Sequence, residues 1–218
     1  MTVKCSVSHP AGSRETRLRL KLDFYRRPVL VVARDCIGKV LVHRTPEGEA
    51  AGRIVEAEAY RGPHDLAAHS ARGRRTQRTE VMFGPPGRAY VYQLYGTSWA
   101  MNLVVGEEGE PHAVLIRAVE PVRGIELIAQ RRDKPMGSRE LSNGPGKLTS
   151  ALGITGAQYG FDLCGELLFL ETWEKPAGRI CRSPRINMNI ETVGQLAARR
   201  RWRFYEGGNR YVSVSPRN

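Results

Sequence analysis

Two glutamates, Glu56 and Glu58, are the residues of this sequence best placed to do chemistry. In a β-strand they would point to one face together with Tyr60, with the two carboxylate-bearing Cα atoms ~6.6 Å apart. The small residues between them would face the opposite way: Val55, Ala57 and Ala59. Carboxylates at such separations hydrolyse glycosidic bonds. A solvated face on an edge strand would show the same pattern, so the pair alone leaves both interpretations open.

Aromatic residues form a second candidate group. In the stretch AYVYQLYG, Tyr90 and Tyr92 fall on one face of a strand, and Tyr95 precedes a turn at Gly96. Two histidines, His64 and His69, follow the strand that carries the glutamates. Tyrosines in strands are commonly packing residues. Aromatic plates also hold unstacked nucleobases, at ~1–3 kcal/mol per base.

Asn102 and Arg117 are polar residues inside otherwise apolar strand-like segments. Buried polar side chains cost free energy unless they are paired, which favours a site over a chance placement. A structural hydrogen bond is the alternative explanation for each of them.

Metal and nucleotide motifs are not indicated. The four cysteines form no C-x-x-C pair, and His64 and His69 lack the H-x-E and P-C-x-x-C signatures of a zinc deaminase. The stretch NGPGKLT resembles a phosphate loop only through Gly146 and Lys147. We therefore predict neither a metal nor a cofactor.

The chain is strongly basic, with 34 Lys and Arg against 22 Asp and Glu and a formal charge of +12 over 218 residues. This excess favours a polyanionic partner, although an evenly charged surface would give the same total. We expect a soluble protein, since no apolar run approaches membrane-spanning length and no secretory signal is evident. Residues 1–22 are basic and poor in acids, which is compatible with a transit peptide or a DNA-touching arm but more typical of a flexible leader.

Turn residues divide the chain into short elements. The stretch TPEG predicts a hairpin whose second arm covers residues 50–60. Further strands are expected at 89–94, 101–105, 113–119, 167–171, 202–205 and 211–214, and helices at 124–132 and 146–152. Strands that follow one another form a meander, not βα units. The predicted fold class is α+β: a single domain with a curved, mainly antiparallel β-sheet and surrounding helices.

Taken in order, these motifs resemble one enzyme family. They are IVEAEAYRG, AAHS, MFGPPGRAYVYQLYG, MNLV, LIRAVEP, LSNGPGKL, ALGI, WRFY and YVSV. Together they are similar to the alkyladenine (3-methyladenine) DNA glycosylases, over roughly residues 23–215. The resemblance implies that residues 23–218 form a DNA glycosylase domain, following the basic leader at 1–22.

The resemblance also implies roles for the candidate residues. Glu58 would be the general base that activates water, supported by Glu56 and by Arg117, which helps to bind that water. The flipped base would lie among Tyr60, His69, Tyr92 and Asn102. Because none of these positions is a lysine, which could form a Schiff base, the enzyme would be monofunctional and leave the strand intact.

Further implications concern the partner. Tyr95 would enter the gap that the extruded nucleotide leaves, and Arg74, Thr76 and Arg78 would contact DNA phosphates. The partner would be double-stranded DNA containing damaged purines, with no membrane and no metal. The enzyme would be an intracellular, DNA-associated monomer of base excision repair, in the cytoplasm and nucleoid or in a nucleus.

Two segments depart from the family pattern. Thr97 and Ser98 replace bulkier residues after the turn, and Asn187 and Met188 replace a glycine-containing stretch. These departures affect the expected grip on DNA and the expected pocket shape. Two alternatives come from other classes: a protein that holds damaged bases without excising them, and an RNA-binding module similar to the carboxy-terminal domain of formyltransferases.

Overall fold

The computed structural model describes residues 17–94, 96–173 and 177–214. Its helices are α1 (Leu22–Tyr25), α2 (Val29–Asp35), α3 (Ile125–Arg132), α4 (Pro145–Leu152) and α5 (Ile190–Arg199). Its strands are β1 (Val40–Thr45), β2 (Gly48–Arg61), β3 (Ala89–Gln93), β4 (Trp99–Val105), β5 (His112–Arg123), β6 (Leu168–Glu171), β7 (Ile180–Ser183) and β8 (Arg203–Glu206). Short 3₁₀ turns lie at Ala71–Gly73, Glu80–Phe83, Arg139–Leu141 and Gly156–Gln158.

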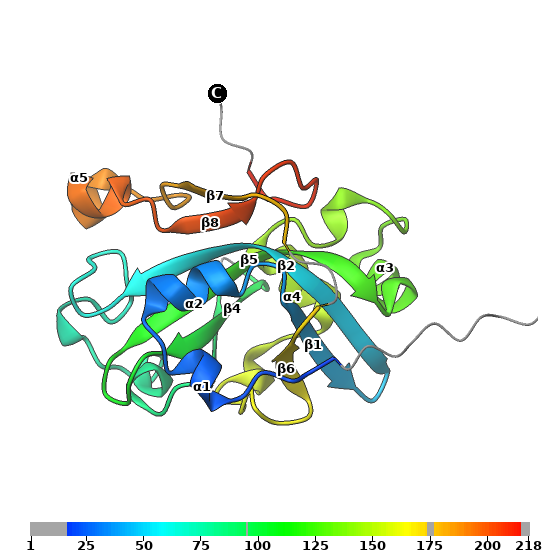
Figure 1. Ribbon diagram of the computed structural model, residues 1–218, viewed down its shortest axis with the longest axis horizontal. Helices are drawn as coiled ribbons and strands as arrows, with labels where there is room; N and C mark the ends of the chain where they lie inside the picture. The colour runs from blue at the N-terminus through cyan, green and yellow to red at the C-terminus, as the bar shows by residue number, and fades with distance from the viewer. Residues whose placement is uncertain (1–16, 95, 174–176, 215–218) are drawn as a thin grey trace, which may run out of the picture.

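Within the described residues, the eight strands form one sheet in which the pairing is antiparallel throughout. The order is β3-β4-β5-β2-β1-β6, and β8 pairs with both β2 and β7. Figure 1 shows the long β2 and β5 crossing the middle of the molecule, with β7 and β8 above them and α5 beyond. The predicted α+β fold with a mainly antiparallel sheet is therefore confirmed.

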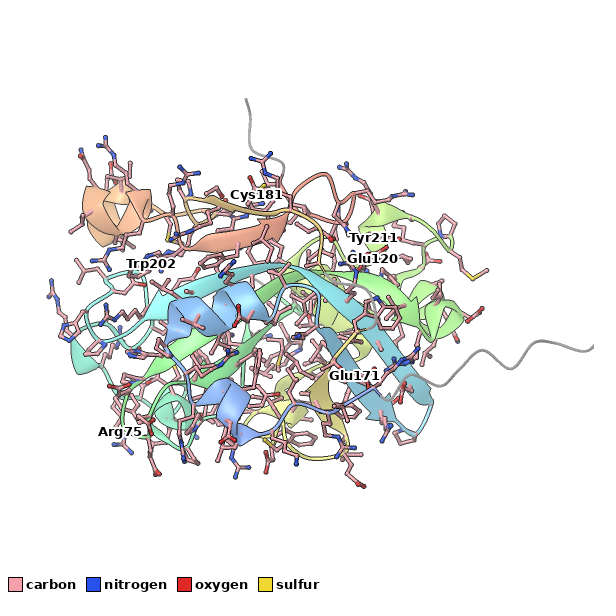
Figure 2. All side chains as sticks on the ribbon, viewed as in Figure 1. Arg75, Glu120, Glu171, Cys181, Trp202 and Tyr211 are labelled. Atoms are coloured by element: carbon pink, nitrogen blue, oxygen red, sulfur yellow. The ribbon has the colours of Figure 1, made fainter. Side chains whose placement is uncertain are left out.

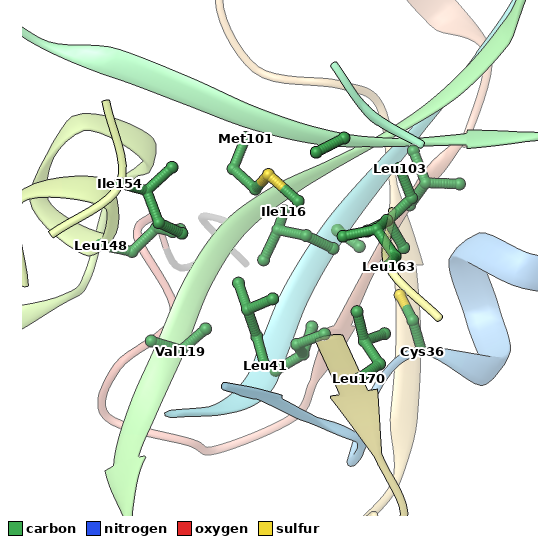
Figure 3. Packing of buried hydrophobic residues seen from close by; sticks show 14 of the residues in the cluster. Cys36, Leu41, Met101, Leu103, Ile116, Val119, Leu148, Ile154, Leu163 and Leu170 are labelled. Atoms are coloured by element: carbon green, nitrogen blue, oxygen red, sulfur yellow. The ribbon is translucent and has the colours of Figure 1, made fainter. Parts of the chain in front are cut away.

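The main core fills the space between the sheet and the helices. Figure 3 shows side chains from several strands, such as Leu41, Met101 and Ile116, meeting Leu148 of α4. Helix α4 begins at Pro145, which is suited to a first helical position, and Gly153, with a left-handed φ of 68°, caps its C-terminal end. Helix α4 packs against β4 and β5, and these contacts fix the position of its first residue, Pro145.

Two predicted details are wrong. Residues 211–214 form no strand: their apolar side chains, Tyr211 and Val212, instead pack with Val55 in a separate cluster. Figure 2 shows Tyr211 beside Glu120. Val55 therefore does not belong with Ala57 and Ala59, which pack in the main core. The β2–β5 register shifts on both sides of Glu56, so the alternation of side chains is broken there.

The leader prediction for residues 1–22 lies mostly outside the described residues. Of its last part, Leu20 donates its N–H to the carbonyl of Leu170 at 2.8 Å, and Leu18 bonds to Thr172. These residues therefore run along β6 before α1 begins.

Candidate active site

Strand β2 changes its neighbour on one edge at the position of the glutamates. Residues up to Arg53 pair with β1, whereas Glu56 and Glu58 pair with Tyr205 and Arg203 of β8. The other edge pairs with β5 over most of the length of β2. Both carboxylates are fully buried. The alternative of a solvated face on an edge strand is therefore wrong.

Three donors hold the carboxylate of Glu58. The hydroxyl of Tyr60 donates to Oε2 at 2.9 Å and Nη1 of Arg117 at 3.4 Å, and the backbone N–H of Ile186 donates to Oε1 at 2.8 Å. An ionised carboxylate accepts about four hydrogen bonds. One acceptor position on Oε1 is therefore left by the described residues.

Glu56 is held more completely. It accepts from Nε of Arg117 at 3.0 Å, from Nε of Arg203 at 2.7 Å, and from the hydroxyl and N–H of Ser213 at 2.9 and 2.6 Å. Burial alone would lower the pKa of Arg117, but the charges of Glu58 and Glu56 outweigh it and the pKa is raised. Glu56 thus fixes the guanidinium that Glu58 shares.

A cavity of about 680 Å³ lies next to Glu58. The three residues that donate hydrogen bonds to Glu58 all line this cavity: Tyr60, Arg117 and Ile186. Burial and the charge of Glu58 raise the pKa of Tyr60 well above its usual value, so its hydroxyl stays protonated and donates. The volume falls within the range of small-ligand sites.

Aromatic rings form part of the cavity lining. The rings of His69 and Tyr92 meet edge to face, with centroids 4.7 Å apart, and Tyr90 lies 5.2 Å from Tyr92. The guanidinium of Arg78 lies 5.6 Å from the Tyr92 ring centroid and also lines the cavity. The predicted residues Tyr60, His69 and Tyr92 are therefore brought together.

His69 is held as a neutral imidazole. Its Nδ1 lies 2.8 Å from the hydroxyl of Tyr90. Burial lowers its pKa to about 4, and the positive charges of Arg78 and Arg74 act in the same direction. The raised pKa of Tyr90, which burial causes, keeps that hydroxyl protonated. The tautomer of the neutral ring sets which of the two groups donates in this hydrogen bond.

Asn102 and Arg117, two of the predicted site residues, both line the cavity. Asn102 also forms the structural hydrogen bond that was the alternative explanation for its position. Its Nδ2 donates to the carbonyl of Tyr90, on the neighbouring strand β3, at 2.9 Å. This bond fixes the amide plane against one wall of the cavity.

Residues 186–188 line the cavity, and sequence reasoning did not predict how this segment is held. Arg185 is buried and forms a bidentate ion pair with buried Asp65, and its guanidinium lies 4.7 Å from the Tyr60 ring centroid. Ile186, Asn187 and Met188 then line the cavity. The only sequence signal for this segment is its departure from the family pattern at Asn187 and Met188.

The predicted phosphate contacts are spread over one loop. Arg74 is exposed, the Thr76 hydroxyl lies 3.1 Å from that of Thr79, and Arg78 turns to the cavity wall. Figure 2 shows Arg75 at the periphery, where it pairs with Glu80. Tyr95, the predicted wedge, lies outside the described residues. Its neighbour Leu94 donates to the carbonyl of Ser98 at 2.7 Å, which closes the 94–98 turn.

The part of the chain that the structure describes was searched for a metal-binding cluster and for a membrane-spanning helix, and neither is found there. No three acidic, histidine or cysteine side chains gather there as a metal site would require. No helix in residues 17–94, 96–173 and 177–214 has the length and apolar character to cross a bilayer.

Comparison with known proteins assigns a family to this geometry. Residues 23–210 match the model of the methylpurine-DNA glycosylases. The chain belongs to this family. It is therefore a DNA glycosylase, an enzyme of DNA repair, and the resemblance predicted from the motifs is confirmed.

Curated bacterial relatives agree with the methylpurine-DNA glycosylase assignment. A protein of Clostridium acetobutylicum is 43% identical over 90% of this chain and 98% of its own length. One of Bacillus licheniformis is 47% identical, over 89% and 96%, and one of Bacillus subtilis is 45% identical, over the same shares. All three are named, provisionally, 3-methyladenine DNA glycosylase.

Proposed function

We propose that this methylpurine-DNA glycosylase is monofunctional and extrudes a damaged purine from duplex DNA into the 680 Å³ cavity. There it hydrolyses the N-glycosidic bond with a water molecule activated by Glu58. The observation that carries the proposal is the position of Glu58, whose three donors all line an aromatic cavity.

The remaining acceptor position on Oε1 of Glu58 suits the attacking water. The distance from Nη1 of Arg117 to Oε2 is 3.4 Å, which is long for a charged hydrogen bond. Because Arg117 lines the cavity, its guanidinium can contact the same water molecule. Glu58 takes the water proton as the oxygen attacks the anomeric carbon, and the purine leaves with the bonding electron pair. Glu56 keeps Arg117 in place throughout.

The aromatic walls account for binding of the extruded base. Tyr60 and Tyr92 offer ring surfaces, and His69 offers an edge with a neutral N–H donor. Flipping costs a few kcal/mol, least for a poorly paired lesion, and stacking offsets this cost. A cationic alkylpurine leaves readily once water is activated, whereas a neutral lesion such as hypoxanthine also needs protonation.

The same proposal covers the approach to DNA. Tyr95, which follows Leu94 in the sequence, fills the gap left in the duplex. Arg74 and its neighbours contact phosphates of the lesion strand. One cavity in one chain suffices for the reaction, so the enzyme works as a monomer on DNA inside the cell.

Single-turnover release of base tests this function. The substrates are duplexes that carry alkylated adenine, hypoxanthine or ethenoadenine, and the variant is Glu58→Gln. The amide cannot accept a proton, so we expect release to slow by ~10²–10⁴ while lesion binding persists.

The matched control for this variant is Glu126→Gln, at an exposed position of α3. We expect it to release base at the wild-type rate. Tight lesion binding by wild type without release of any base would contradict hydrolysis and would favour a protein that only recognises damage.

A further inference from the structure

Asn187 lines the cavity next to Glu58, but the chemistry proposed above gives it no role. Its backbone φ is 57°, in the left-handed region that few residues other than glycine adopt. Asparagine is one of these few residues. Glycine would give the backbone the same conformation without placing a side chain at the cavity. The conformation alone therefore does not require the amide group.

The backbone on both sides of Asn187 is fixed. Before it, Arg185 is held in a buried ion pair, and the N–H of Ile186 donates to Oε1 of Glu58 at 2.8 Å. After it, the side chain of Asn189 accepts a backbone N–H at 2.9 Å as the N-cap of α5. These contacts hold Asn187 in position at the cavity wall.

The side-chain amide of Asn187 is available to a ligand. It has no hydrogen-bond partner among the residues that the structure describes. Asn102 differs, because its Nδ2 already donates to the carbonyl of Tyr90. An amide side chain offers two N–H donors and one acceptor oxygen. A purine in the cavity can therefore receive a hydrogen bond from Asn187 without breaking one inside the protein.

The position of Asn187 determines which part of an extruded purine it meets. Ile186 donates to the same oxygen of Glu58 that suits the attacking water, so this segment lies at the sugar end of the base. The Cα of Asn187 is only about 3.8 Å from that of Ile186. In a purine, N3 and N7 flank the glycosidic nitrogen, whereas N1 and the 6-substituent lie at the far edge. A donor on Asn187 therefore meets N3 or N7.

We propose that Asn187 is a specificity-determining residue, whose amide donates a hydrogen bond to N3 or N7 of the extruded purine. The inference rests on the proposed function. Hypoxanthine and ethenoadenine keep the lone pairs of both nitrogens. A methyl group on the contacted nitrogen removes the acceptor and leaves the donor unpaired. Asn187 thus sets the preference between purines alkylated at N3 and purines alkylated at N7.

Binding of deaza analogues tests the contact. The parent protein is Glu58→Gln, so that no base is released, and the duplexes carry hypoxanthine, 3-deazahypoxanthine or 7-deazahypoxanthine. Adding Asn187→Gly, which suits the left-handed backbone, should weaken binding of the hypoxanthine duplex by about 2- to 10-fold, as loss of one neutral hydrogen bond does. The same substitution should not weaken binding of the analogue that lacks the contacted nitrogen, because that duplex has already lost the bond. This analogue then identifies the nitrogen.

Two results would overturn the proposal. Equal affinities of the parent and the Asn187→Gly protein for the hypoxanthine duplex would show that the amide makes no contact with the base. Weakening by the same factor for all three duplexes would show that Asn187 acts only through the backbone of its segment.

Asp133→Gly is the matched control. Asp133 also has a left-handed backbone, with a φ of 48°, but it lies at the C-terminal end of α3 and does not line the cavity. Its replacement should change the affinity for all three duplexes by one common factor. Failure of the proposed function would look different, because wild-type protein would then release no base, whereas failure of this inference leaves base release intact.

Discussion

At the residue scale, the candidate site combines residues that are close in the sequence with hydrogen-bond donors that are far away in it. Strand alternation brings Glu56, Glu58 and Tyr60 to one face, so these residues could be predicted from spacing. The groups that hold Glu58 from the other side could not, since Ile186 follows it by 128 positions and nothing in a dipeptide Arg-Ile indicates a bond to a carboxylate. His69 could be predicted through the family motif, but its neutral state depends on burial and on the arginines around it.

Arg78 provides a test of that electrostatic arrangement. Its positive charge disfavours the imidazolium form of His69, so Arg78→Gln should raise the pKa of His69 from about 4 toward 6.5, the usual value. A histidine NMR titration measures this, with the His69 resonance assigned from His69→Gln protein.

Arg75→Gln removes an equal charge from the same loop, at a residue paired with exposed Glu80, and should leave the pKa of His69 unchanged. An equal rise in the two variants would show that overall charge, and not the position of Arg78, sets the pKa of His69.

At the element scale, β2 is the element that assembles the site. Its two halves have different partners on one edge, and the register shift at Glu56 marks the exchange of β1 for β8. The alternation of apolar and polar residues predicts the strand but not the change of partner from β1 to β8. For this reason the alternation wrongly places Val55 on the same face as Ala57 and Ala59. Helix α5 was not predicted, and Gly194, with a left-handed φ of 78°, interrupts it.

The buried pair of Asp65 and Arg185 joins the loop after β2 to the segment before α5. Asp65→Asn should cost about 3–5 kcal/mol of unfolding free energy, because it leaves a buried guanidinium without its compensating charge. Urea unfolding measures this. Base release by the folded variant should also slow, since Arg185 fixes the position of Ile186.

An exposed ion pair is the control for this variant. Glu80→Gln breaks the contact with Arg75, where both side chains are more than half exposed, and the unfolding midpoint should not move. A similarly small effect of Asp65→Asn would show that Arg185 is held by its carbonyl contacts to Ala59 and Ala197.

At the scale of the whole molecule, the fold class followed from the succession of short strands and turns. The strand order did not, because pairings such as β1 with β6 join residues far apart in the sequence. Residues 211–214 show the limit of the method: they alternate like a strand, but their task is to cover Val55 and to bond Glu56. The net charge of +12 indicated a polyanion without indicating which face binds it.

Arg74 tests where that charge acts. We expect Arg74→Gln to lower the salt slope of lesion-duplex binding by about one, as loss of one phosphate contact requires. Arg75→Gln changes the net charge equally and should have a smaller effect, because Arg75 is already paired with Glu80. Identical slopes for wild type and Arg74→Gln would place this arginine away from the DNA.

The hydrogen bonds from Ser213 to Glu56 and from Ile186 to Glu58 also determine when the site can form during synthesis of the chain. Both acids are made early, yet their partners come 157 and 128 residues later in the chain. A nascent chain on the ribosome therefore carries β2 long before the β8 partner of this strand and the donors to its two glutamates exist. Contacts of such long sequence separation form slowly. Hydrolytic competence should consequently appear only after Ser213 has been synthesised, and chains that stop before this residue should be inert toward DNA rather than partly active.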